Sequence, residues 1–164
     1  MTRAEGDGYA IAYLNEVGEG YGFRKVRKEL GVSEFGVNAI VLPAGLETGF
    51  HAHERQQELY FVHAGRLEFE FGDGSKHALE AGGLARVDAP TMRKITNVGD
   101  EDAVYVIVGA EGGYVGRDGI APEGEQRVRN PGGVGRRRGR LRHQTRGPRG
   151  WMLRLGILAL ESKS

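Results

Sequence analysis

The chain has 164 residues and no cysteine, so it has the length of one domain and can contain neither disulfides nor thiolate metal ligands. Its formal net charge of +1 hides an uneven distribution, because residues 1–124 carry 12 Lys and Arg against 20 Asp and Glu, whereas residues 125–164 carry 11 against 2. No apolar run has the length of a signal peptide or a bilayer span, so we expect a cytoplasmic protein without a membrane partner.

Residues 1–124 are predicted to form an all-β domain. Runs of strand-forming residues alternate with Gly, Asp and Pro turn signals, at 9–14, 36–42, 49–53, 58–62, 66–71, 84–89, 93–98 and 103–108. Residues 71–75 (FGDGS) indicate a tight hairpin, because Asp-Gly suits positive backbone angles. Only residues 23–31 offer a possible helical turn. Many short strands at this spacing predict a sandwich or barrel.

Residues 125–164 are predicted to be a disordered, basic tail. This Arg/Gly-rich segment has little apolar periodicity and cannot form a packed core. The run GRRRGRLR has the composition of non-specific phosphate binders, but it lacks interleaved aromatic residues, so nucleic-acid binding is not the favoured interpretation. Residues 151–160 (WMLRLGILAL) could form a short amphipathic helix against the barrel, a partner or a membrane surface. His143 is assigned no role.

Strand alternation predicts which side chains face the interior. Leu67, Phe69 and Phe71 share one face, which we expect to be core. His51 and His53 also share a face, because strand side chains repeat every two residues. Glu58 falls on the same face as Tyr60. If these faces point inward, two imidazoles and a carboxylate converge inside the barrel.

Residues 45–65 resemble the first motif of the cupins. The spacing is G-x5-H-x-H-x4-E-x6-G, and the matching positions are Gly45, His51, His53, Glu58 and Gly65. The resemblance covers residues 35–110 and implies a cupin-type double-stranded β-helix, a jelly-roll barrel of six to eight strands. It also implies that the two histidines and the glutamate are metal ligands.

The second cupin motif, G-x5-P-x-G-x2-H-x3-N, is altered in this chain. It begins after a gap of 16 residues (66–81) and retains Gly82 and Asn97. Asp88, Pro90 and Arg93 replace its proline, glycine and histidine. Arg93 therefore stands where the family has a fourth metal ligand, and a guanidinium has no lone pair to donate to a metal.

Two arrangements of this site remain open. In the first, His51, His53 and Glu58 hold a divalent ion (Fe, Mn, Zn, Ni or Co), and Arg93 tilts outward or binds an anionic substrate. In the second, Arg93 pairs with Glu58 and replaces the metal. The two retained histidines favour the first arrangement, because buried imidazoles need partners that a metal would supply.

The remaining polar residues near the site have weaker assignments. Tyr60 and Gln57, with Arg93, are the candidate substrate-binding residues, and Gln56 or Gln57 could serve as an outer hydrogen bonder. Asp88 is expected to contact Arg93 or the backbone. His63 and His77 are expected to be surface residues outside the site.

Three functions follow as hypotheses. The first is a metal-dependent enzyme of the oxygenase, isomerase or cyclase type, acting on a small molecule that Arg93 would orient if it is an anion. The second is a small-molecule-binding module without turnover. The third is an interaction protein whose basic tail contacts nucleic acid. The family resemblance also implies a homodimer, in which residues 9–14 are a candidate edge-pairing element.

Overall fold

The computed structural model describes residues 3–122. The predictions for residues 125–164, namely the disordered tail, the amphipathic helix at 151–160, the absence of a role for His143 and the possible nucleic-acid contact, lie outside the described residues. The division of the chain at residues 124 and 125 therefore stays a prediction. Within residues 3–122, no helix combines the length and the apolar character that a membrane span requires.

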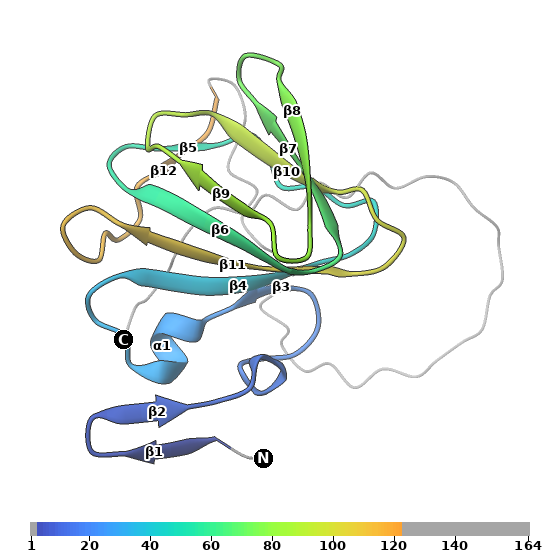
Figure 1. Ribbon diagram of the computed structural model, residues 1–164. Helices are drawn as coiled ribbons and strands as arrows, with labels where there is room; N and C mark the ends of the chain where they lie inside the picture. Colours follow the sequence, from blue (N-terminus) through green and yellow to red (C-terminus); the bar gives the residue numbers. More distant parts are fainter. Residues whose placement is uncertain (1–2, 123–164) are drawn as a thin grey trace, which may run out of the picture.

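The described chain is built almost wholly from strands (Figure 1). Its one α-helix, α1 (Val26–Leu30), is short, and a 3-10 turn covers Leu14–Glu16. The strands in chain order are β1 (Ala4–Gly6), β2 (Tyr9–Ile11), β3 (Gly22–Arg24), β4 (Gly36–Leu42), β5 (Ala52–His53), β6 (Gln57–Ala64), β7 (Arg66–Phe71), β8 (Lys76–Glu80), β9 (Leu84–Val87), β10 (Arg93–Asn97), β11 (Ala103–Ala110) and β12 (Gly119–Ile120).

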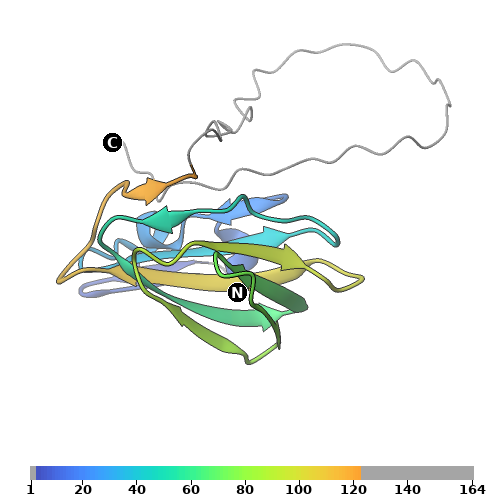
Figure 2. The same ribbon diagram turned by 90° about the horizontal axis from the view of Figure 1, so that it is seen from above.

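Two antiparallel sheets enclose the interior. One has the order β3-β4-β11-β6-β9, and the other has the order β10-β7-β8. Residues 47–51 run along the free side of β10, where Glu47 bridges Thr96 and His51 bridges Arg93. β5 continues this segment and pairs with β12. Figure 2 shows the two layers from above, with β12 lying beside β5 at the edge of the barrel. The predicted all-β jelly roll is confirmed.

Alternating apolar residues of the two sheets form one core. Its buried members are Ile40, Leu42, Tyr60, Val62, Leu67, Phe69, Val87, Ile95, Ala103 and Tyr105. The predicted core face of β7 is confirmed, because Leu67 and Phe69 are buried and Phe71 packs partly buried against them. Each large apolar side chain buried in this way contributes about 1.5–3 kcal/mol to folding.

The structure explains why the first motif ends with a glycine. Gly65 joins β6 to β7 with a φ of +82°, a left-handed conformation that L side chains rarely adopt. A Cβ atom added there would lie 2.7 Å from the Cα atom of Ala103 on β11. The tight turn and the close approach of β11 therefore both require glycine.

The observed elements differ from the predicted ones mainly at the edges of the barrel. β4 and β7 have the predicted bounds, and the helix falls inside residues 23–31, preceded by β3. The run predicted at 9–14 ends as a strand at Ile11. β8 follows the Asp-Gly hairpin but was not predicted, because its residues KHALE are mostly exposed and show no apolar alternation. His63 and His77 are exposed, as expected.

Candidate metal centre

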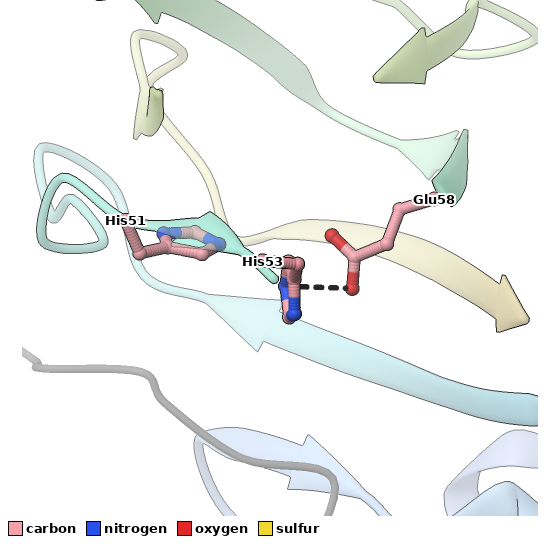
Figure 3. A group of neighbouring side chains, drawn as sticks. All are labelled: His51, His53 and Glu58. Carbon is pink, nitrogen blue, oxygen red and sulfur yellow. Dashed lines mark ion pairs between the residues drawn. The ribbon is translucent and has the colours of Figure 1, made fainter. Parts of the chain in front are cut away.

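Three potential metal ligands converge inside the barrel. His51 is fixed beside β10 by a pair of backbone hydrogen bonds, from its N–H to the carbonyl of Arg93 (3.0 Å) and from the Arg93 N–H to its own carbonyl (2.9 Å). His53 ends β5, and Glu58 lies near the start of β6. All three side chains are buried, and one ligand atom from each lies within 4.8 Å of the others. Figure 3 shows these side chains turned toward one another.

His51 presents a neutral imidazole to this centre. Its Nδ1 atom lies 3.0 Å from the carbonyl oxygen of Gly49, which can only accept a hydrogen bond. Nδ1 therefore carries the proton, and Nε2 keeps its lone pair. Burial, followed by the charge of Arg93, lowers the pKa of His51 to about 4. Near neutral pH the ring is thus in the form that binds metals.

His53 lies between two carboxylates. Its Nδ1 atom is 2.7 Å from Oδ1 of Asp118, and its Nε2 atom is 3.3 Å from Oε1 of Glu58. Burial alone would lower the pKa of His53, but the hydrogen bonds to Glu58 and Asp118 outweigh it and raise the pKa. Because both facing groups are oxygens, Nε2 requires either a proton or a cation between itself and Glu58.

Glu58 divides its two oxygens between different partners. Oε2 accepts a hydrogen bond from Nη2 of Arg93 at 2.5 Å and another from the hydroxyl of Tyr60. Oε1 faces His53. Burial acts to raise the pKa of Glu58, but His53, Arg93 and Tyr60 together hold it at about 2, so the carboxylate is ionised. One oxygen therefore remains for a metal.

Arg93 is fully buried, with 0% of its surface exposed. Besides Glu58, its Nε atom donates to the Tyr60 hydroxyl (3.2 Å) and its Nη1 atom to the carbonyl of Thr91 (3.0 Å). The expectation that Arg93 tilts outward is wrong. A buried guanidinium needs an anion, and Glu58 is the carboxylate that it reaches. The contact expected for the second arrangement is thus present.

The donor set nevertheless fits a divalent ion. Two imidazole nitrogens and one carboxylate oxygen suit Zn, Fe, Mn, Ni and Co. Ligand atoms that share one metal at about 2.1 Å lie at most about 4.2 Å apart. The 4.8 Å spread of the three residues is close to this limit and requires only small side-chain shifts.

The other predicted residues take different places. Tyr60 is buried at the centre, where burial raises the pKa of its hydroxyl well above the usual value. Gln57 is exposed on the opposite face of β6, so the structure does not bring it to the ligands, and its amide donates to Oδ1 of Asp88 (2.6 Å). Asp88 also pairs with Arg86 at 3.5 Å, where we expected Arg93 or the backbone as its partner.

Two residues contact Nδ1 of His53 in a way that the sequence does not indicate. Gln56 is buried, and its amide nitrogen lies 2.8 Å from Nδ1 of His53. Asp118, the closest partner of His53, was not identified from the sequence. It lies 65 positions further along the chain, in a segment without a strand pattern, so no local signal connects the two residues.

Comparisons with known proteins agree with this architecture. The family model described as a cupin domain matches residues 38–109. A solved sugar phosphate isomerase from a cupin superfamily, from Silicibacter pomeroyi DSS-3, is similar with 26% identity and a TM-score of 0.50 over 64% of this chain and 60% of that chain. This chain thus spans less than two thirds of that isomerase. Among curated proteins, none matches.

Two further solved structures show the same fold. One is a conserved protein with a double-stranded β-helix domain from Klebsiella pneumoniae, with 23% identity and a TM-score of 0.53 over 62% of this chain and 90% of that chain. The other is a cupin protein from Bacteroides fragilis, with 18% identity and a TM-score of 0.53 over 79% of this chain and 98% of that chain. The family model shows a cupin domain at residues 38–109, and the sheet order and the buried His-His-Glu group agree with that domain.

Proposed function

We propose that this cupin binds one divalent cation and acts with it on a small organic anion. The cation would be held by Nε2 of His51, Nε2 of His53 and Oε1 of Glu58. The observation that carries the proposal is the orientation of the two rings, since each Nδ1 atom faces an oxygen and each Nε2 atom remains for the site. A bound divalent cation would supply Lewis-acid polarisation of a substrate oxygen.

The charges around the site support an anionic ligand. Arg93 neutralises Glu58, and Asp118 provides one further negative charge. A divalent cation added to these three groups leaves one net positive charge in a buried environment, where charges are weakly screened. The isomerase similar to this chain acts on a sugar phosphate, according to its description, which keeps isomerisation of a phosphorylated or acidic compound among the candidate reactions. Oxygenase and cyclase chemistry remain alternatives.

A second function is a binding module in which Arg93 replaces the metal. The buried ion pair between Arg93 and Glu58 favours it, because the guanidinium already compensates the carboxylate. A proton on His53 would complete this metal-free site by donating to Glu58. Such a barrel would retain a small ligand without converting it.

Metal analysis separates the two functions. We would strip the purified full chain with a chelator, reconstitute it with Fe(II), Mn(II), Zn(II), Ni(II) or Co(II), and measure bound metal by mass spectrometry. We expect about one ion per chain, lost in His51→Ala and His53→Ala. His63→Ala is the matched control, because His63 is exposed on β6. No metal above background in the wild type would reject the metal site and favour the binding module.

Turnover is then measured on the loaded protein. Single-turnover assays against hydroxy acids, sugar phosphates and flavonoid-like compounds would reveal product if the protein is an enzyme. Retention of an unchanged compound by the wild type would support the binding module.

A further inference from the structure

Asp118 is held in the fold by backbone contacts. The residues after it form β12, in which Gly119 pairs with His53 and Ile120 with Ala52. The carbonyl of Asp118 also accepts a hydrogen bond from the N–H of Glu54 at 3.0 Å. These contacts fix the residue against the segment that carries His53, although Asp118 lies outside residues 38–109, which match the cupin family.

The Asp118 carboxylate accepts four hydrogen bonds and is only 5% exposed. Oδ2 accepts hydrogen bonds from the backbone N–H groups of Arg55 (3.1 Å) and Gln56 (2.9 Å). Oδ1 accepts hydrogen bonds from Nδ1 of His53 (2.7 Å) and from the side-chain amide of Gln56 (2.8 Å). Each oxygen therefore has a separate task, since one anchors the carboxylate to the turn and the other faces the imidazole.

The contact with Asp118 bears on which ring nitrogen of His53 carries the proton. An ionised carboxylate can only accept hydrogen bonds, and both ring nitrogens of His53 face one. Nδ1 lies 2.7 Å from Asp118 whereas Nε2 lies 3.3 Å from Glu58, so we expect the single proton of the neutral ring on Nδ1. A proton on Nδ1 leaves the lone pair of the neutral ring on Nε2, the atom that faces Glu58. An acceptor behind a metal-binding histidine is a common way to set its tautomer and orientation.

We propose that Asp118 is a positioning residue that fixes the tautomer and ring orientation of His53, so that Nε2 is available to a divalent cation. The inference rests on the proposed metal site. It assigns to a residue beyond the family-matching range the task of preparing a ligand within it. Gln56 donates to the same oxygen that faces His53, and its amide nitrogen also lies 2.8 Å from Nδ1 of His53. Because that nitrogen is a donor, Asp118 is the acceptor for a proton on Nδ1.

Asp118→Asn gives a directional test. The two backbone N–H groups of Arg55 and Gln56 would retain the amide oxygen, which turns the amide NH₂ group toward His53. Because this NH₂ group is a donor, Nδ1 of His53 must then accept a hydrogen bond. We therefore expect the proton to move from Nδ1 to Nε2. The lone pair needed by a metal would then point away from the site.

The experiment uses the full chain with ¹⁵N-labelled histidine and zinc alone as the probe. NMR of the metal-free protein in the alkaline range, where imidazoles are neutral, reports the tautomer. We expect the Nδ1–H form of His53 in the wild type and the Nε2–H form in Asp118→Asn, with zinc affinity reduced by about 10–100-fold. Asp88→Asn is the matched control, because Asp88 contacts Gln57 and Arg86 but no histidine. It should change neither result.

Two results would overturn the inference. One is a wild-type His53 in the Nε2–H form, and the other is an Asp118→Asn protein that keeps both the wild-type tautomer and the wild-type zinc affinity. If the wild type binds no zinc, the metal proposal fails, and the tautomer comparison still decides whether Asp118 sets the form of His53. If Asp118→Asn does not fold, the wild-type tautomer alone decides.

Discussion

Arg93 and Glu58 depend on each other at the centre of the barrel. Their ion pair is fully buried, so removing one partner leaves an uncompensated charge. We expect Arg93→Met to lower the free energy of unfolding of the metal-free protein by about 3–5 kcal/mol, measured by urea denaturation. Added Zn(II) should restore part of this loss, because a cation at the site takes over the compensation of Glu58.

Arg86→Met is the matched control for this substitution. Arg86 forms an ion pair with Asp88 at 3.5 Å, but both side chains are largely exposed. Surface pairs of this kind contribute little, so the urea midpoint should stay close to that of the wild type. Equal effects of the two substitutions would contradict a structural role for the buried pair.

The buried histidine and glutamate make the metal-free protein sensitive to acid. The pKa of His51 is about 4 instead of 6.5, so the unfolded chain binds more protons and stability falls as the pH drops from 6.5 toward 4. Glu58, with a pKa of about 2 instead of 4.5, adds a further loss below pH 4.5. His53 acts in the opposite direction, because its raised pKa adds stability that is lost as the pH rises above 6.5.

Urea midpoints measured across this pH range in the presence of a chelator would check the prediction. His51→Asn should flatten the decline between pH 6.5 and 4, whereas His63→Asn at an exposed position should not. A decline that His51→Asn leaves unchanged would show that His51 does not titrate as a buried neutral ring.

The convergence of the three candidate ligands could be predicted from the sequence better than their surroundings. Alternation along two short strands and the motif spacing were sufficient to bring His51, His53 and Glu58 together. The side-chain direction of Arg93 depends on burial and on the reach of its guanidinium, which no strand pattern encodes. Asp118 was out of reach because its contact with His53 joins segments 65 positions apart in the chain.

At the scale of elements, β11 must pass close to the turn that precedes β6. Gly109 on β11 is the point of contact, since a Cβ atom there would lie 2.6 Å from Oε1 and 3.2 Å from Cδ of Gln56. Gln56 is buried and cannot swing into solvent. We expect Gly109→Ala to reduce the free energy of unfolding by about 1–3 kcal/mol, measured by urea denaturation.

Gly116→Ala provides the comparison for this prediction. No atom lies within 4 Å of the position that its Cβ would take, so the added methyl group should be tolerated. If both alanine variants unfold at the same urea concentration, the close packing of Gln56 over Gly109 is not important for stability.

Strands could be predicted where both sheets contribute to the core. β4 and β7 have the predicted bounds because their apolar residues alternate or run without interruption over a whole strand. β5 has only two residues and β12 likewise, so their pairing follows from the path of the chain around the barrel and not from composition. The altered second motif did not disturb the fold, since Asn97 still donates to the carbonyls of Leu42 and Glu101 (2.8 Å each).

At the scale of the whole molecule, the acidic and basic parts of the chain are predicted to be independent. A chain ending at residue 124 retains every described strand. We expect this truncated protein to have the melting temperature of the full chain, measured by circular dichroism. A lower melting temperature would mean that residues 125–164 stabilise the barrel, and a loss of DNA binding at low salt would support the interaction-protein hypothesis.

The homodimer implied by the family resemblance is a prediction for the same scale. Leu59, Phe61 and Leu84 are exposed on neighbouring strands β6 and β9, with Phe61 opposite Leu84. Apolar side chains gathered on a sheet surface favour association. We expect light scattering to give the mass of a dimer for the wild type and of a monomer for Phe61→Glu. A monomeric wild type would contradict the prediction.

The buried charges have a consequence for the order in which related sequences can change. Asp118, His53, Glu58 and Arg93 form a continuous row across the barrel, with neighbours at 2.7, 3.3 and 2.5 Å. Replacing a single member leaves the group next to it without its partner, whereas replacing Arg93 and Glu58 together, or His53 and Asp118 together, removes both partners of one pair. Changes at this site should therefore be coupled, and a cupin with an uncharged residue in place of Arg93 needs either another cation beside Glu58, such as a metal, or a second change at Glu58.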